Sequence, residues 1–167
     1  MVDNQHKAVA VGADAFCAKP VDRGWLLDRL NALSKPAGPG SVLLIDDDEA
    51  SRYLLKGHLA VTPFRVIEAP SGREGLRLAQ QEGPRAIFLD LKMPDLSGFD
   101  VLKMLQADPA TRDIPVLIHT SQILEDAERG RLAGAAAILP KEGLSRESVK
   151  VSLHEALGRP EVRKEEN

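Results

Sequence analysis

Two short apolar runs that end in acidic residues constrain the fold of this chain most strongly. Residues 42–45 (VLLI) run directly into Asp46, and residues 86–89 (AIFL) run directly into Asp90. Uninterrupted apolar runs of this length are typical of strands that are buried on both faces of a parallel sheet. Since parallel strands end at one edge of their sheet, the two acidic segments are expected to meet at the carboxyl edge, where open α/β sheets bind ligands.

Amphipathic segments alternate with the strand-like runs along most of the chain. The sequence predicts strands over residues 42–45, 64–68, 86–89, 115–119 and 136–139, and helices over residues 49–60, 71–81, 98–107, 124–133 and 146–157. Leu54, Leu55 and Leu59 are expected on one side of the first helix, and Ser71 and Glu74 are expected to form a capping box in the second. The predicted fold class is α/β, a doubly wound, five-stranded parallel sheet with helices on both faces.

Composition narrows the classes of function. The formal net charge is −3, Cys17 is the only cysteine, and no apolar stretch is long enough to span a bilayer. This charge gives no reason to expect nucleic acid or an anionic membrane as a partner. A single cysteine forms no internal disulfide, which agrees with a reducing compartment. The sequence therefore predicts a cytoplasmic location without contact to nucleic acid or membrane.

A segment of alternating proline and glycine, residues 35–40 (KPAGPG), predicts a linker. It separates an N-terminal piece, residues 1–38, from a main domain over residues 39–160, which is followed by a charged tail over residues 161–167. The length of the main domain suits a single hydrophobic core.

The N-terminal piece resembles the end of the main domain. Residues 12–19 (GADAFCAK) parallel residues 134–141 (GAAAILPK), and an amphipathic helix is expected after the lysine that ends each segment. Such short runs are common, so chance similarity is the alternative, but we favour a partial repeat made of one strand and one helix. The helix would expose apolar side chains and is expected to pack on the main domain or on a second copy of the chain, giving a homodimer: Trp25, Leu26, Leu30 and Leu33.

Acidic residues and one lysine form the candidate site. Asp46, Asp47 and Asp90 follow two predicted strands, and Lys141 follows the last one. Converging carboxylates repel one another unless a hard cation such as Mg²⁺ bridges them, and a lysine would complete a site for an anion. The pattern predicts a phosphorylatable aspartate, Asp90, in a metal-dependent pocket. Asp48 competes with its neighbours for the metal positions, but Asp46 is placed first because the apolar run stops at the residue before it.

Further motifs follow the predicted strand ends: Met93-Pro94 and Gly98 after Asp90, and Thr120-Ser121 after the fourth strand. With them, residues 41–159 resemble the receiver domain of two-component response regulators. The resemblance implies a flavodoxin-like strand order, 2-1-3-4-5, and a phosphoryl group taken from a phosphohistidine on a histidine kinase or a histidine phosphotransfer domain. It also implies that Asp90 is the phosphoacceptor, that Thr120 and Lys141 contact the phosphoryl oxygens, and that Mg²⁺ is held by Asp46, Asp47, Asp90 and the backbone carbonyl of Lys92. By position, the Lys92 side chain and Ser121 are expected to modulate the phosphorylated state. The alternatives are a solvated loop lysine and a small residue that only fits the available space.

Two positions depart from the family pattern. Ile138 stands three residues before Lys141, where many receivers carry an aromatic side chain, and Glu142 stands where a proline usually follows the lysine. Signalling through Thr120 and a rotating ring is therefore not expected. A cis peptide after Lys141 is not expected either, because non-proline cis bonds cost about 3 kcal/mol.

Two other functions compete with phosphoacceptance. A phosphatase that resembles haloacid dehalogenases would use Asp46 of an Asp-x-Asp motif as its nucleophile, but Ala50 stands where Thr or Val usually continues that motif, and the chain lacks room for a cap domain. A receiver-like scaffold that binds partners without phosphorylation is the third possibility. The acidic cluster argues against it, because packed like charges without a metal are retained at a cost.

The surroundings of the main domain predict its context. A partial receiver upstream, and the few residues after the main domain, are expected for the C-terminal receiver of a hybrid histidine kinase that takes part in a phosphorelay. A stand-alone regulator with an N-terminal extension is the alternative. No stand-alone enzyme activity is expected beyond self-phosphorylation and autodephosphorylation.

Overall fold

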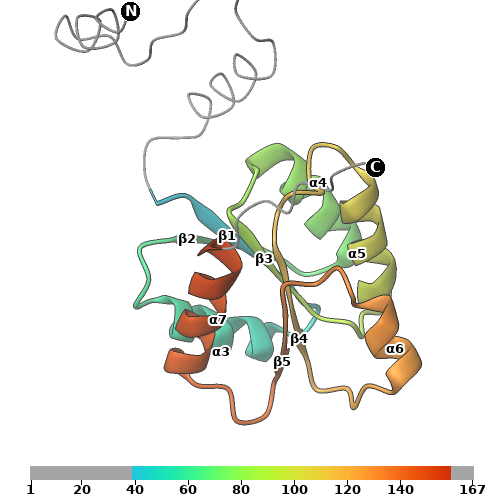
Figure 1. Ribbon diagram of the computed structural model, residues 1–167. Coiled ribbons are helices and arrows are strands. Elements are labelled where there is room, and N and C mark those ends of the chain that lie inside the picture. The colour runs from blue at the N-terminus through green and yellow to red at the C-terminus, as the bar shows by residue number, and fades with distance from the viewer. Residues whose placement is uncertain (1–38, 159–167) are drawn as a thin grey trace, which may run out of the picture. The chain divides into compact units, whose positions relative to one another are not determined.

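One parallel sheet covered by helices makes up the part of the chain that the structure describes, residues 39–158 of a computed structural model (Figure 1). The five strands lie in the order β2-β1-β3-β4-β5. They are β1 (Ser41–Ile45), β2 (Arg65–Ala69), β3 (Ala86–Leu89), β4 (Val116–Thr120) and β5 (Ala137–Pro140). The helices are α3 (Glu49–Leu59), α4 (Gly72–Glu82), α5 (Gly98–Ala107), α6 (Asp126–Arg131) and α7 (Arg146–Gly158). The predicted fold class and strand order are confirmed.

The two faces of the sheet carry separate apolar layers. In Figure 1, α3 and α7 lie on one side of the sheet, and α4, α5 and α6 lie on the other. Successive residues of a strand point to opposite faces, so a strand covered on both sides is apolar at every position. The layer under α3 and α7 contains Val42, Leu44, Phe88 and Leu117, and the layer under α4 and α5 contains Leu43, Ile45, Ile87 and Leu89.

The register of the strands sets what stands at the carboxyl edge. The last residues of β1 and β3, Ile45 and Leu89, are paired, and the Asp90 amide donates to the Ile45 carbonyl over 2.9 Å. Asp46 and Asp90 therefore follow on neighbouring strands. The Lys141 amide donates to the Thr120 carbonyl over 3.0 Å, which places the lysine at the same edge, directly after β5.

Three local predictions differ from the structure. Leu55 and Leu59 are buried in the first helix as expected, but Leu54 is 63% exposed, because it lies about 100° around the helix from Leu55. The capping box at Ser71 is only half formed: its hydroxyl accepts from the Glu74 amide over 3.2 Å, while the Glu74 carboxylate pairs with Arg77 instead. Finally, α6 covers only Asp126–Arg131 of the predicted residues 124–133.

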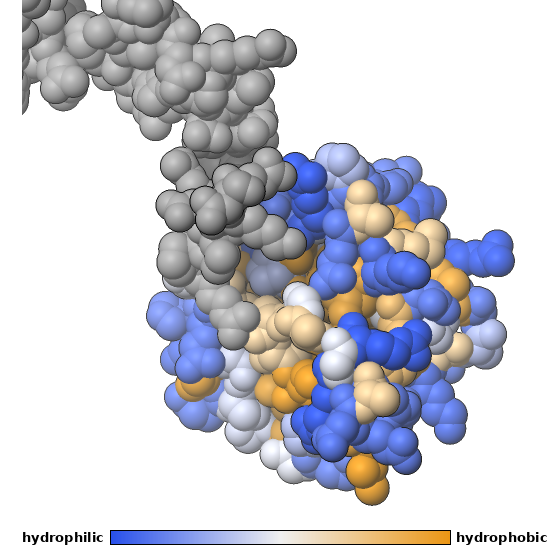
Figure 2. Space-filling model, turned by 45° about the vertical axis from the view of Figure 1, so that its right-hand side comes forward, coloured by the Kyte–Doolittle hydropathy of each residue, from blue (hydrophilic) through white to orange (hydrophobic). Residues whose placement is uncertain are grey.

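The described surface is mixed. On the face shown in Figure 2, hydrophobic residues stand in small groups among many hydrophilic ones. The most exposed large apolar side chains include Ile123 in the loop before α6, and Tyr53 and Leu54 on α3. Within residues 39–158, none of the helices has the length and hydropathy needed to cross a membrane.

The predicted partial repeat in residues 1–38 and the charged tail, residues 161–167, lie outside the described residues. The helix that carries Trp25, its packing on the main domain or on a second copy, and the boundaries of the main domain stay predictions.

Gly98 closes the loop that follows Asp90, and its substitution tests how tightly this loop is built. The Gly98 amide donates to the Leu91 carbonyl over 2.9 Å, and a Cβ at Gly98 would lie 2.6 Å from the Leu91 Cα and closer still to the Asp90 carbonyl oxygen. Backbone atoms cannot move aside as a flexible side chain does, so Gly98→Ala is expected to lower the free energy of unfolding by roughly 1–3 kcal/mol, as overpacking does.

Gly57→Ala is the matched control, measured in the same urea denaturation series. Gly57 lies on the exposed side of α3 with no atom within 4 Å of an added Cβ. This change is expected to raise the free energy of unfolding by up to about 1 kcal/mol, the difference in helix propensity. Equal effects of the two substitutions would contradict the close approach at Gly98.

Candidate functional site

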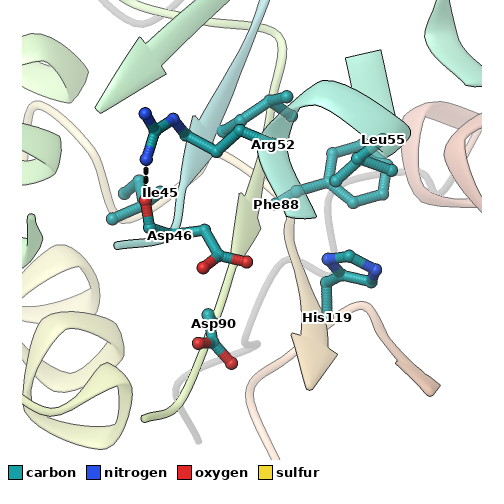
Figure 3. A pocket seen from close by; sticks show the side chains of 8 residues that line it. Ile45, Asp46, Arg52, Leu55, Phe88, Asp90 and His119 are labelled. Carbon is teal, nitrogen blue, oxygen red and sulfur yellow. Dashed lines mark hydrogen bonds between the residues drawn. The ribbon is translucent and has the colours of Figure 1, made fainter. Parts of the chain in front are cut away.

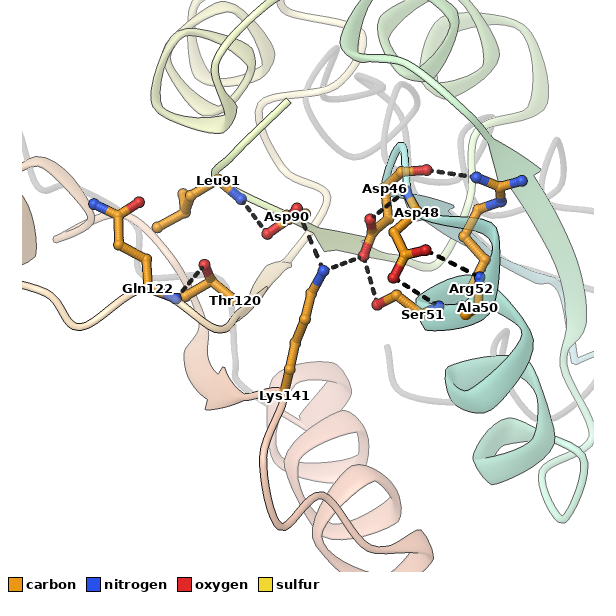
Figure 4. A network of polar contacts seen from close by, with 10 residues as sticks. All are labelled: Asp46, Asp48, Ala50, Ser51, Arg52, Asp90, Leu91, Thr120, Gln122 and Lys141. Carbon is orange, nitrogen blue, oxygen red and sulfur yellow. Dashed lines mark hydrogen bonds and ion pairs between the residues drawn. The ribbon is translucent and has the colours of Figure 1, made fainter. Parts of the chain in front are cut away.

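Four strand ends bring the predicted site residues together. Asp46 follows β1, Asp90 follows β3, Thr120 ends β4, and Lys141 follows β5. All four lie at the carboxyl edge of the sheet, where Figure 4 shows the lysine side chain reaching between the two aspartates. Contacts of Lys141 with Asp46 and Asp90 bring three of these four side chains together, and the roles expected for them stay predictions.

Lys141 bridges the two buried carboxylates. Its Nζ lies 2.7 Å from Asp46 Oδ2 and 3.4 Å from Asp90 Oδ2. Asp46 and Asp90 are only 4% and 5% exposed. Two carboxylates with so little access to water are costly unless a cation compensates their charge. The ammonium of Lys141 provides that compensation from the fifth strand.

The three aspartates that follow β1, residues 46–48, have different contacts. Asp46 Oδ1 accepts from the Asp48 amide over 2.9 Å, and Asp46 Oδ2 accepts from the Ser51 hydroxyl over 2.8 Å. Asp48 turns the other way and caps α3, because its carboxylate accepts from the Ala50 and Ser51 amides over 3.2 and 3.3 Å. Asp47 is left as the exposed member that faces the other carboxylates.

Three carboxylates form a donor set that suits Mg²⁺. Asp46, Asp47 and Asp90 each offer an oxygen, and these oxygens lie within 4.8 Å of one another. Mg²⁺ prefers oxygen ligands, takes them from one or two carboxylates, and keeps several waters. The residues present therefore fit this ion, because all three donors of the cluster are carboxylate oxygens.

The remaining predicted residues surround this cluster without joining it. Thr120 is buried, and its Oγ1 accepts from the Gln122 amide over 3.2 Å. The side chain of Lys92 is exposed between the buried Leu91 and Met93, and Ser121 is exposed. Among the described residues, no hydrogen bond or ion pair joins Lys92 or Ser121 to the carboxylates.

Arg52 is a site residue that the sequence did not reveal. Its Nη1 donates to the Asp46 carbonyl over 2.8 Å, as Figure 3 shows, and its Nε lies 3.4 Å from Glu68 Oε1 on β2. This arginine thus anchors the peptide of Asp46 to the neighbouring strand. Its only signal in the sequence was a place in the second turn of the helix after the acidic run, which does not distinguish it from a solvated arginine.

His119 lines the same depression as Asp46 and Asp90 (Figure 3). It is buried on the face that α3 and α7 cover. Burial, together with the nearby charge of Lys141, lowers the pKa of His119 to about 4. The imidazole is therefore neutral at pH 7.

Burial and charge oppose each other at Asp90. Burial raises the pKa of Asp90, the ammonium of Lys141 lowers it, and the charge of Asp46 raises it further; the net pKa lies above the ordinary value. For Lys141, burial lowers the pKa, but hydrogen bonds and charges from Asp46 and Asp90 outweigh burial and raise it. The lysine is therefore protonated at pH 7, whereas the surroundings of Asp90 disfavour its ionised form.

Asp90→Asn is expected to stabilise the metal-free protein at pH 7, because the folded state raises the pKa of Asp90 and so disfavours its ionised form. A raised pKa means that wild type regains this stability as the pH falls through the pKa of folded Asp90. The difference between the two proteins should therefore shrink between pH 7 and pH 4. Urea denaturation with EDTA at several pH values measures it.

Asp108→Asn is the control with the opposite sign. Its carboxylate accepts from the Ala110 amide, which, with the Gln80 amide group, lowers the pKa of Asp108. Asp108 thus contributes stability above its unfolded pKa, and the variant is expected to be less stable than wild type at pH 7. A destabilised Asp90→Asn at pH 7 would show that pairing with Lys141 outweighs burial.

Known proteins are similar to this chain in sequence and in fold. The model of the response regulator receiver domain matches residues 42–151. The polar-differentiation response regulator DivK of Brucella anthropi is 33% identical over 104 residues, which are 62% of this chain and 85% of DivK.

Solved structures agree with this family match. Chemotaxis protein CheY4 of Vibrio cholerae is similar with a TM-score of 0.64 and 26% identity, over 71% of this chain and 98% of CheY4. The Mn²⁺-bound form of response regulator Rcp1 is similar with a TM-score of 0.59 and 25% identity, over 70% of this chain and 91% of Rcp1. With its strand order, its acidic edge and the match over residues 42–151, the chain belongs to the response regulator receiver domain family of two-component signalling.

Proposed function

We propose that this receiver domain takes a phosphoryl group from a phosphohistidine onto Asp90, with Mg²⁺ bound by the carboxylates beside it. The observation that carries the proposal is the position of Asp90 directly after β3. Its carboxylate and those of Asp46 and Asp47 offer oxygens within 4.8 Å of one another, and the Lys141 ammonium lies 3.4 Å from Asp90. The donor is a histidine kinase or a histidine phosphotransfer domain. Placement in a hybrid kinase and its phosphorelay remains a prediction from the sequence.

The transfer exchanges a bond to nitrogen for a bond to oxygen. A carboxylate oxygen of Asp90 attacks the phosphorus of the phosphohistidine, a P–O bond forms and the P–N bond breaks. The electron pair of the broken bond stays on the ring nitrogen, which takes up a proton and leaves as neutral imidazole. Asp90 must be ionised to attack, whereas burial raises its pKa. The charge of Lys141 lowers the pKa of Asp90, and a bound Mg²⁺ would lower it further.

The metal roles follow from what each carboxylate already holds. Both oxygens of Asp46 accept hydrogen bonds, and one also pairs with Lys141, so Asp46 suits a coordinated water better than direct ligation. Asp47, Asp90 and the carbonyl of Lys92 would be the direct ligands. When bound, Mg²⁺ supplies positive charge that lets an anionic phosphoryl group approach the carboxylates. The Mn²⁺-bound form of the similar Rcp1 supports a divalent cation here.

Lys141 and Thr120 would hold the transferred phosphoryl group. Lys141 already lies between the two aspartates, where its ammonium can pair with a phosphoryl oxygen. Thr120 Oγ1 accepts from the Gln122 amide, which leaves its hydroxyl proton to donate. The exposed Lys92 is close in sequence to Asp90 and is proposed to slow hydrolysis of the acyl phosphate, with Ser121 as a second nearby hydroxyl.

The exposed side of α3, which carries Tyr53 and Leu54, is the proposed contact surface for the phosphodonor. Tyr53 and Leu54 are 76% and 63% exposed, and Val61 just beyond the helix is also exposed. Exposed large apolar side chains at adjacent positions favour a protein contact. The first turn of the same helix holds Asp46 through Ser51, so a partner docked on this side would have its histidine near Asp90.

The phosphatase alternative is not favoured. Asp46 would have to attack a phosphoester, yet its two oxygens are engaged by Asp48, Ser51 and Lys141. Asp90 accepts one hydrogen bond, from the Leu91 amide over 2.8 Å, and its other oxygen faces Lys141. Asp90 is therefore the freer nucleophile. The inert-scaffold alternative leaves the intact acidic cluster without a purpose.

Phosphorylation by a small phosphodonor with Mg²⁺ tests the proposal. Wild type is expected to gain one phosphoryl group that is lost at alkaline pH, and Asp90→Asn is expected to gain none, as measured by intact mass. Asp46→Asn is expected to be labelled more slowly but still on Asp90, because Asp46 acts through the metal. A phosphopeptide that maps to Asp46 in Asp90→Asn would support the phosphatase alternative instead.

Asp47 and Asp48 should separate metal binding from stability. Asp47→Ala is expected to weaken Mg²⁺ binding at least about tenfold, or 1.4 kcal/mol, with little change in stability. Asp48→Ala removes the cap of α3 and is expected to cost about 1 kcal/mol of stability with near-normal Mg²⁺ affinity. Calorimetric titration and urea denaturation of both variants measure this crossed pattern. A greater loss of affinity in Asp48→Ala would mean that Asp48 holds the metal position.

A further inference from the structure

The loop from Asp90 to Ser97 is held at both ends by contacts already described. At its start, Leu91 is buried and its amide donates to Asp90 Oδ1 over 2.8 Å. At its end, the Gly98 amide donates to the Leu91 carbonyl over 2.9 Å. These contacts close the loop but leave its middle, beyond the buried Met93, to be fixed by something else.

Asp95 fixes the middle of the loop to a different element. Its Oδ1 accepts from the Gly72 amide over 3.2 Å, and its Oδ2 accepts from the Arg73 amide over 3.1 Å. These amides begin α4, more than twenty residues earlier in the chain. The first amides of a helix have no partner within it, and a carboxylate there is favoured by the helix dipole. Asp95 therefore cross-links the loop after Asp90 to the start of α4.

The helix itself does not depend on this cross-link. Ser71 already caps α4, with its hydroxyl accepting from the Glu74 amide over 3.2 Å. Asp95 is exposed, so little buried surface depends on it either. The contact constrains the path of the chain between Met93 and Gly98. This stretch directly follows the peptide of Lys92, so its path also affects how that peptide is oriented.

We propose that Asp95 is a positioning residue, which holds the loop so that the Asp90 carboxylate and the Lys92 carbonyl face the metal together. The inference rests on the proposed function, because it concerns the same metal site. It assigns to Asp95 no contact with the metal or the phosphoryl group. Residues that orient metal ligands commonly change affinity 10- to 100-fold when they are lost, and one loop contact is expected to fall at or below the lower end of that range.

Asp108 offers a matched control. Its carboxylate also caps a turn through a backbone amide, Ala110, over 2.9 Å, and reaches another helix through the Gln80 side chain over 2.6 Å. It stands at the C-terminal end of α5, whereas the loop of Asp90 leads into the N-terminal end. Asp95→Ala and Asp108→Ala thus each remove a contact between a carboxylate and backbone amides. Asp95 lies before α5 in the chain, and Asp108 lies directly after it.

Calorimetric titration with Mg²⁺ on the full chain is the main measurement. Asp95→Ala is expected to raise the Kd for Mg²⁺ about three- to tenfold, and Asp108→Ala to leave it within twofold of wild type. Asp95→Asn removes the same charge but keeps one oxygen acceptor, so its Kd is expected between those of wild type and Asp95→Ala. In wild type, Mg²⁺ should slow hydrogen exchange at the Gly72 and Arg73 amides, because linkage between two sites is reciprocal.

The other outcomes are distinct. A wild-type Kd in Asp95→Ala, or equal loss in Asp95→Ala and Asp108→Ala, overturns the positioning role. An Asp95→Asn protein as weak as Asp95→Ala overturns it as well, since charge alone would then set the affinity. A wild type that binds no Mg²⁺ and accepts no phosphoryl group overturns the proposed function itself, whatever the variants show.

Discussion

The ammonium of Lys141 between Asp46 and Asp90 is the contact on which the rest of the site depends. Two carboxylates that are almost fully buried at one sheet edge repel each other and lose hydration. The lysine compensates both, with Nζ 2.7 Å from one and 3.4 Å from the other. The pKa directions follow from this balance: the lysine stays protonated, and Asp90 is strained when ionised. A site built in this way favours further positive charge, and the proposed Mg²⁺ supplies it.

Rigid backbone holds these charges in place. Parallel pairing of Ile45 with Leu89 puts Asp46 and Asp90 on neighbouring strand ends, and Arg52 ties the Asp46 carbonyl to Glu68 on β2. The loop after Asp90 closes on Gly98, and this close approach requires glycine because a Cβ would collide with the backbone of Asp90 and Leu91. A binding site gains precision when its loops are fixed to a packed scaffold in this way. As a consequence, small backbone changes near Gly98 should also displace Asp90.

Ile138 on β5 occupies the position of the aromatic side chain in the family pattern, and it is 37% exposed. A response to the proposed phosphorylation is therefore not expected to pass through a rotating ring at this position, and we expect it to travel through other contacts. The cross-link from Asp95 to the start of α4 is one such contact in the described part of the chain. It joins the loop after Asp90 directly to the helix that follows β2.

The sequence by itself determined the order of the elements and the fold class, and it singled out Asp46, Asp90 and Lys141 as candidate site residues. These depend on local patterns: apolar runs, their acidic ends and the spacing of motifs. Tertiary structure decided the rest. Within the acidic run, the point at which α3 begins makes Asp48 its cap, and the fold brings Asp47 to Asp46 and Asp90 in the carboxylate cluster. Leu54 faces outward and Glu74 pairs with Arg77, three residues further along the same helix, so among several local options the sequence pattern did not single out the one that forms. Arg52 and Asp95 act through partners on other elements, and a pairing between residues far apart in the chain leaves no periodic signal in the sequence.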